Sequence, residues 1–174
     1  MRLPILVFVS AVLGLSASSL AQQPPAPAKP NAATVERARY VGLKYVSLPD
    51  GLEEASGELM GSVDDPLGYA LREIHRGRVK MLWLERKVSG DKPGQPNWEV
   101  KDVLVLPAML KRQNISSNCY AGKKSDQEIV AIVAKSSGEL LRVRRAWRAN
   151  RKTEKFEGLS LKGITCVNEG IGGP

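Results

Sequence analysis

The stretch VKMLWLERKVSGDKPGQPNWEVKDVLVL, residues 79–106, decides the fold. It contains two apolar, β-prone runs, Val79–Val88 and Trp98–Leu106, separated by a segment rich in glycine and proline. Two such runs joined by turn residues predict a long antiparallel hairpin. One tryptophan lies on each run, Trp83 on the first and Trp98 on the second. We expect both in the hydrophobic core, with an exposed aromatic patch for sugars or a protein partner as the alternative.

The C-terminal half continues the β pattern. Four further runs suit strands and are separated by turn residues: Gln127–Ala134, Leu140–Arg148, Phe156–Leu161 and Ile164–Val167. Short runs of this kind, each bounded by turn chemistry, favour antiparallel neighbours. We therefore predict a C-terminal antiparallel meander over residues 128–167.

The N-terminal half is mixed. Alternating apolar residues in Arg39–Leu48 predict a half-buried strand, whereas Leu52–Val63 has helical spacing weakened by two glycines. Asp65-Pro66 resembles a helix start, and helical apolar spacing continues to Ile74. The alternative is a strand over Tyr69–Ile74 that turns at residues 75–78. The predicted class is α+β, mainly antiparallel β-sheet, with one or two short helices near residues 52–76 and one disulfide.

The first residues predict export. A short basic start, an apolar run and small residues before a cleavage point make residues 1–21 a cleavable signal peptide, which places the mature protein in the periplasm or outside the cell. The cleavage point lacks a cysteine, so a lipoprotein is not expected, and no later apolar run predicts a transmembrane segment after cleavage. Residues 22–33 form a predicted proline-rich flexible spacer, 34–169 a single globular domain, and 170–174 a frayed tail.

The chain has two cysteines, Cys119 and Cys166. In an exported domain such a pair most often forms one disulfide, and the absence of a Cys-x-x-Cys motif argues against a disulfide-exchange enzyme. The alternative is a reactive Cys119 thiolate partnered by His75, the only histidine.

A basic run near the C-terminus is the main candidate for a binding site. If Leu140–Arg148 is a strand, alternation places Arg142, Arg144 and Arg148 on one face. Arg151 and Lys152 extend this cationic stripe, whose guanidinium groups suit phosphate or carboxylate ligands. The alternative is a solvated strand face in which the arginines pair with acidic residues of neighbouring strands, such as Glu154 and Glu157.

Charge supports an anionic partner. The chain carries a net charge of +8, which falls to +7 when Arg2 leaves with the signal peptide. The expected partners are an anionic envelope polymer, a lipid surface or an acidic protein. Export excludes cytoplasmic nucleic acid as a partner.

No motif for catalysis or metal binding stands out. His75 and Glu73 offer two possible ligands, too few for a typical zinc site. Ser89–Lys92 matches Ser-x-x-Lys but lies in a turn-rich segment without the companion motifs. We therefore predict no catalytic residues, no metal and no cofactor. The expected function is non-enzymatic binding in the bacterial envelope; the alternatives are a protein-binding accessory factor or inhibitor of an envelope enzyme, and, disfavoured, a small hydrolase.

Overall fold

The computed structural model describes residues 31–61, 68–88 and 97–169. The predicted signal peptide, most of the predicted spacer and the predicted tail lie outside these ranges. So do Asp65-Pro66, the Ser-x-x-Lys segment and most of the turn-rich segment between the two runs of the hairpin.

The described residues form one helix and twelve strands. Their bounds are α1 Ala32–Tyr40, β1 Lys44–Tyr45, β2 Glu53–Met60, β3 Tyr69–Arg76, β4 Val79–Val88, β5 Asn97–Val105, β6 Gln113–Ser116, β7 Cys119–Ala121, β8 Lys124–Ser125, β9 Ile129–Ala134, β10 Leu140–Asn150, β11 Lys155–Gly158 and β12 Ile164–Val167.

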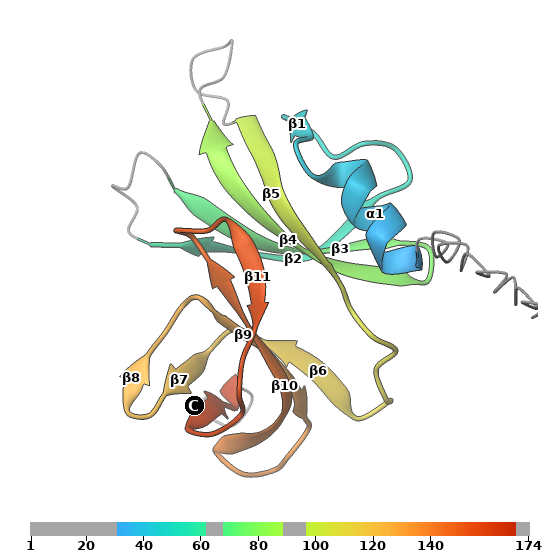
Figure 1. The fold of residues 1–174 in the computed structure, drawn as a ribbon. Helices are drawn as coiled ribbons and strands as arrows, with labels where there is room; N and C mark the ends of the chain where they lie inside the picture. The colour runs from blue at the N-terminus through green and yellow to red at the C-terminus, as the bar shows by residue number, and fades with distance from the viewer. Residues whose placement is uncertain (1–30, 62–67, 89–96, 170–174) are drawn as a thin grey trace, which may run out of the picture.

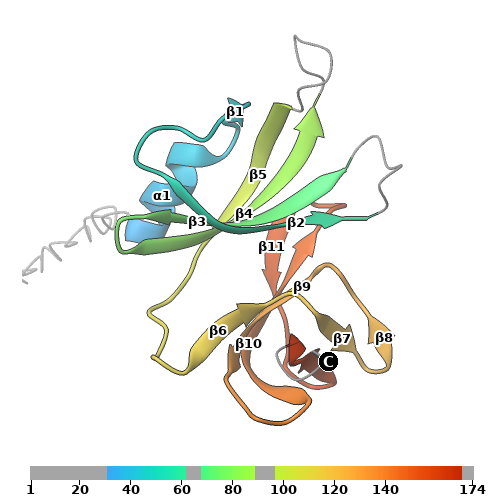
Figure 2. The same ribbon diagram turned by 180° about the vertical axis from the view of Figure 1, so that it is seen from behind.

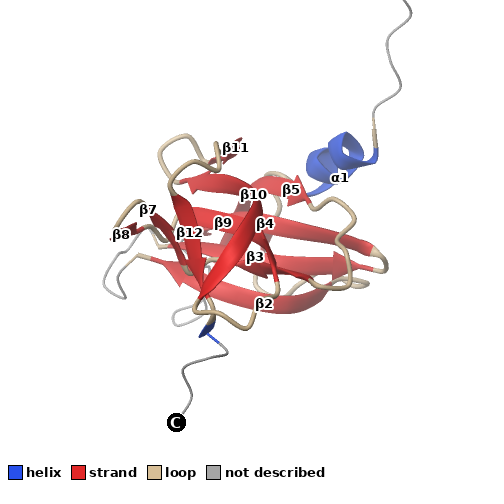
Figure 3. Cartoon of the chain, turned by 90° about the horizontal axis from the view of Figure 1, so that it is seen from below, coloured by secondary structure: helices blue, strands red, loops and turns tan. Residues whose placement is uncertain are grey.

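The strands form two antiparallel sheets stacked on each other. The first sheet has five strands in the order β1-β5-β4-β3-β2, and the second has the order β6-β9-β10-β12-β7-β8, with β11 paired to β10. Figure 1 shows α1 on one side of the first sheet and the second sheet on the other. Figure 2 shows the reverse side, where β11 rises from the second sheet toward the first. The view in Figure 3 looks through the second sheet onto the first.

Three clusters of buried side chains hold these layers together. The first lies between α1 and the first sheet and contains Tyr40, Trp83 and Trp98. The second fills the space between the two sheets, with Leu84 from β4 and Val130 from β9. The third lies inside the curled second sheet and surrounds the disulfide. Both tryptophans of residues 79–106 are therefore core residues, as predicted.

The predicted hairpin is present: β4 and β5 pair in antiparallel register from Met81 opposite Val105 to Val88 opposite Asn97. Because α1 covers one face of β4 and the second sheet covers the other, all four residues Met81–Leu84 are buried. A strand buried on both faces reads as a continuous apolar run, and that is the pattern the sequence shows.

Where one or two short helices were predicted near residues 52–76, the described residues form strands β2 and β3. Gly77, with a φ of +59°, starts the two-residue turn between β3 and β4, and a positive φ at that position suits a hairpin turn. In β3, Ala70 and Ile74 pack beneath α1, whereas Leu71 packs against the second sheet. Burial on both faces removes the two-residue period and leaves apolar spacings that imitate a helix. The alternative interpretation, a strand turning at residues 75–78, was the better one.

The helix lies earlier than expected. The Asn31 side chain caps α1 by accepting a hydrogen bond from the Thr34 backbone N–H at 2.8 Å. The helix begins inside the predicted spacer and continues through the first residues of the predicted strand Arg39–Leu48. Gly42, with a φ of +87°, follows the helix, and only Lys44 and Tyr45 then pair with β5.

The C-terminal half is antiparallel, but it is not a simple meander. Strands β9, β10 and β11 pair in succession, whereas β12 returns to the beginning of β10 and also pairs with β7. Cys166 on β12 lies directly opposite Cys119 on β7, and their disulfide confirms the predicted pairing. It also rules out the alternative of a free Cys119 thiolate.

The disulfide should contribute strongly to stability, because it closes a loop with a sequence separation of 47 residues. We expect the double variant Cys119→Ala/Cys166→Ala to lose on the order of 4 kcal/mol of unfolding free energy, by the loop-entropy model. Urea denaturation followed by tryptophan fluorescence measures this loss. An unchanged midpoint in the variant would mean that the second sheet holds its curl without the covalent link.

Candidate functional site

The basic run lies on β10, but a β-bulge splits it. Val143 lies opposite Val133 and Arg145 opposite Ile132, which leaves Arg144 without a cross-strand partner. An extra residue in a strand shifts the alternation of the residues that follow it. The predicted single stripe of Arg142, Arg144 and Arg148 is therefore wrong.

Cross-strand partners show which arginines share a face. Arg142, Arg145 and Trp147 lie opposite Ala134, Ile132 and Val130, which are alternate residues of β9 and project from one face of the sheet. The three side chains therefore share that face. Arg148 lies opposite Ile129, on the other face of the sheet. The bulge has thus moved Arg148 away from Arg142.

Arg148 and Arg151 are held by acidic neighbours. Arg148 bridges Asp126 at 2.8 Å and Glu128 at 3.0 Å, and Arg151 reaches Glu128 at 2.9 Å. Partial burial opposes ionisation of Glu128, but hydrogen bonds from Arg151 and Arg148 outweigh it and hold the pKa of this carboxyl below its ordinary value. Two members of the predicted stripe are thus engaged within the fold.

The predicted alternative named other partners for these arginines. Glu154 instead pairs with Arg86 and Lys101 of the first sheet, at 2.9 Å and 2.8 Å. Glu157 lies opposite Arg148 in the ladder but accepts hydrogen bonds from Asn150 and Thr153. The acidic partners of Arg148 and Arg151 are instead Asp126 and Glu128, in the segment before β9, about twenty residues away in the sequence.

Three guanidinium groups remain available to a ligand. Arg142, Arg144 and Arg145 are exposed, and no acidic side chain of the described residues lies within 4.0 Å of them. We call these three residues the arginine surface. Lys152 is also exposed, in the turn after β10, where its backbone N–H bonds to the Asn150 side chain at 2.9 Å.

A cleft of about 600 Å³ opens where the second sheet meets the first. Ser56 and Glu73 of the first sheet form one wall. The other lining residues come from the second sheet and its connections: Asn114, Ile115, Ser116, Ser117, Asn118, Val133, Lys135, Ser136, Leu141, Val167, Asn168 and Glu169. We call this the polar cleft. Sequence reasoning missed it, because its residues are scattered along the chain and form no motif.

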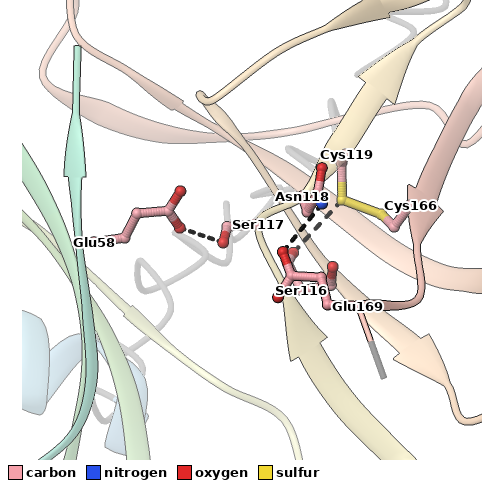
Figure 4. The surroundings of a disulfide bond; sticks show 7 residues. All are labelled: Glu58, Ser116, Ser117, Asn118, Cys119, Cys166 and Glu169. Carbon is pink, nitrogen blue, oxygen red and sulfur yellow. Dashed lines mark hydrogen bonds between the residues drawn. A yellow bond between two sulfur atoms is a disulfide. The ribbon is translucent and has the colours of Figure 1, made fainter. Parts of the chain in front are cut away.

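Hydrogen bonds fix the walls of the polar cleft next to the disulfide. The Ser117 hydroxyl donates to Glu58 of β2 and so ties the two sheets together, and the Asn118 amide donates to Glu169 at 3.0 Å. Figure 4 shows both contacts beside Cys119–Cys166. The covalent link thus anchors Asn118 and Glu169, two neighbours of its cysteines in the sequence.

His75 lies on β3 beside Glu73, with Nε2 at 2.7 Å from Oε1. Lys80 also approaches the Glu73 carboxylate, at 3.8 Å. Within the described ranges, no group of three or more His, Cys, Asp and Glu side chains is arranged to hold a metal ion. Of the helices in those ranges, none has the length and apolar character needed to cross a membrane.

A buried polar network lies on the α1 side of the first sheet. The Glu85 carboxyl is fully buried, accepts a hydrogen bond from the Tyr45 hydroxyl and lies 2.8 Å from Arg72 Nε. Arg72 also pairs with Glu54 at 2.6 Å and lies 5.1 Å from the centre of the Trp98 ring. The sequence signal for this network is Glu85, the acidic residue that directly follows the apolar run Met81–Leu84, and it was not singled out from the sequence.

Burial dominates the ionisation of this network. Loss of hydration raises the pKa of Glu85 to about 7, although the Tyr45 hydrogen bond and the Arg72 charge both favour the ionised form. Burial and the Glu85 carboxylate also raise the pKa of Tyr45 above its ordinary value, so the phenol stays a donor. Of this network, Arg72 and Glu54 line a pocket of about 140 Å³, whereas the Glu85 carboxyl is fully buried.

Comparison with known proteins finds no matching family model, no matching curated protein and no matching solved structure. Function must therefore be argued from this chain's own surfaces.

Glu85 should make stability depend on pH. Its pKa rises from 4.5 to about 7 on folding, so the folded state binds the proton more tightly and loses stability as the pH increases through this window. Because one pKa unit corresponds to about 1.4 kcal/mol, the loss is on the order of 3 kcal/mol. Urea denaturation between pH 4 and pH 8 should show this component in the wild type and not in Glu85→Gln. Parallel pH profiles for the two proteins would contradict the assignment.

Proposed function

We propose that this chain is an exported, non-enzymatic protein of the bacterial envelope that binds phosphate or carboxylate groups through the arginine surface. The observation that carries the proposal is the exposure of Arg142, Arg144 and Arg145 without an acidic partner among the described residues. A ligand can engage these groups without first breaking an internal ion pair. Arg148 and Arg151 are left out of the site because Asp126 and Glu128 already hold them.

The position of the three arginines favours an extended anionic partner. The bulge places Arg144 beside two arginines that share one face, so three forked donors project within four consecutive residues. Guanidinium groups bind phosphate and carboxylate by paired hydrogen bonds. The net charge of +7 that remains after Arg2 leaves with the signal peptide adds long-range attraction toward the same partners.

The test is co-sedimentation of the purified, oxidised protein with phosphatidylglycerol vesicles and, separately, with peptidoglycan. Near an anionic surface each arginine is worth about 1 kcal/mol, so Arg142→Glu/Arg144→Glu/Arg145→Glu should weaken binding at least about a hundredfold. High salt should weaken the binding of the wild type as well, because it shortens the range of the attraction.

The matched control changes the same amount of charge elsewhere. Lys123 and Lys162 lie in two neighbouring turns, joined by a hydrogen bond from Gly122 N–H to Gly163 O at 2.7 Å, and Lys124 begins β8; all three lysines are exposed. Lys123→Glu/Lys124→Glu/Lys162→Glu should retain most of the binding. An equal loss of binding in both variants would mean that net charge alone, and not the arginine surface, causes the binding. Unchanged binding by the arginine variant would overturn the proposal.

Export is the second part of the proposal. The oxidised Cys119–Cys166 pair is consistent with an oxidising compartment. Expression of the full chain in a bacterium, followed by intact-mass measurement of the periplasmic fraction, should give a protein that begins at Gln22. Recovery of the uncleaved chain from the cytoplasm alone would contradict it.

A further inference from the structure

Strand β6 has an open edge. Among the described residues it pairs only with β9, in the register Asn114 opposite Val133 and Ile115 opposite Ile132. Lys135 N–H donates to Arg112 O at 2.8 Å, which continues this ladder by one hydrogen-bonded pair. In an antiparallel ladder the residues bonded to the neighbouring strand alternate with residues whose backbone groups point away from it.

The alternation assigns the direction of each backbone group. Asn114 bonds toward β9, two residues after Arg112, so the N–H and C=O of Ile115 point away from β9. Gln113 N–H points the same way, and the Leu110 carbonyl accepts it at 2.9 Å. Among the described residues, neither the N–H nor the C=O of Ile115 has a hydrogen-bond partner. A strand edge of this kind is a template for pairing with another segment.

The polar cleft borders β6, because Asn114, Ile115 and Ser116 are among its lining residues. Ile115 lines the polar cleft and also an adjoining pocket of about 130 Å³, and the two spaces share Ser56, Glu73 and Ser117. A volume of about 600 Å³ lies within the usual range of ligand sites. The cleft therefore gives an incoming strand room beside Ile115.

The two sides of the cleft differ in chemistry. Ile115 packs in the cluster between the sheets, so its side chain points toward the wall that carries Ser56 and Glu73. On the other side the lining includes the apolar residues Val133, Leu141 and Val167. A strand paired to β6 would place alternate side chains on these two sides.

The lining excludes other ligand classes. None of the described lining residues is aromatic, so the cleft offers no ring on which a sugar or a base could stack. Among the described lining residues Lys135 is the one cation, which is too little for a phosphate cluster. Glu73, which also contacts His75 and Lys80, and Glu169 set two carboxylates against this one ammonium and leave the lining with one net negative charge. The amides of Asn114 and Asn118 suit the donors and acceptors of a peptide backbone.

We propose that the polar cleft binds an extended peptide segment of a partner protein, which pairs as an added strand with the open edge of β6. The peptide alternates basic residues, which face Glu73, with apolar residues, which face Val133 and Leu141. The three arginines of the arginine surface do not line the cleft, although Arg145 and Ile115 both lie opposite Ile132 and share a face of the second sheet. The ligands of the two sites have opposite charges.

The probe is the synthetic peptide acetyl-Lys-Val-Lys-Val-Lys-amide, added to the ¹⁵N-labelled, oxidised protein. We expect saturable shifts in the NMR spectrum around β6 and at least a tenfold slower hydrogen exchange of the Ile115 amide, since strand pairing protects this N–H. The same peptide with Glu in place of Lys should leave the Ile115 amide unprotected, even where it contacts the arginine surface. Absence of saturable binding, or binding without protection of Ile115, overturns the proposal.

Two variants test the geometry. Ile115→Pro removes the outward N–H without removing a hydrogen bond to β9, and Ile115→Ala loses side-chain packing but keeps the N–H. The peptide should bind the alanine variant and fail to bind the proline variant. Equal affinity of the proline and alanine variants for the peptide contradicts the proposal. Glu73→Gln tests the wall that faces the basic residues of the peptide and should weaken peptide binding several-fold. Unchanged affinity of the Glu73→Gln variant also contradicts the proposal. The Arg142→Glu/Arg144→Glu/Arg145→Glu variant should bind the peptide no more weakly than the wild type, so failure of one site is distinguishable from failure of the other.

Discussion

Strand β4 must be covered on both faces, and the rest of the structure follows from this constraint. Its residues Met81–Leu84 are large, apolar and buried, with Met81 and Trp83 facing α1 and Leu82 and Leu84 facing the second sheet. Burying each such side chain contributes on the order of 2 kcal/mol. Neither the helix nor the second sheet can be removed without returning half of this run to water. The two sheets and the helix therefore form one cooperative unit.

Two buried carboxylates lock the layers in place. Asp102 of β5 accepts the Phe156 backbone N–H at 2.9 Å and lies 2.7 Å from Arg37 Nε of α1, so it joins helix, first sheet and second sheet. Glu85 of β4 plays the corresponding part on the α1 side, where it bonds the Tyr45 hydroxyl. This contact explains why a strand as short as β1 is retained: its pairing with β5 presents Tyr45 to Glu85. Buried carboxyl groups of this kind are costly unless every neighbour is in place, so they favour one arrangement of the layers.

What the sequence predicted well, and what it missed, follows from the same burial. The hairpin of residues 79–106 could be predicted because long apolar runs flank a segment rich in glycine and proline. Residues 52–76 could not, because Ala70, Leu71 and Ile74 are buried on two different faces and their spacing imitates a helix. The short helix was missed because its alanines follow the prolines of the predicted spacer. The disulfide was predictable, since two cysteines allow only one pairing.

The surfaces that could bind partners were harder to predict than the core. A single bulge at Arg144 reversed the faces of the arginines that follow it, and no rule of alternation indicates where a bulge occurs. The polar cleft depends on which strand edge is left unpaired, a property of sheet order and not of any local pattern. Both surfaces nevertheless depend on the second sheet. Its bulged strand presents cations, and its edge strand β6 borders a cleft whose described charged lining residues are Glu73, Glu169 and Lys135. The two proposed sites would let one protein hold an anionic surface with β10 of the second sheet and a basic peptide segment in the cleft between the two sheets.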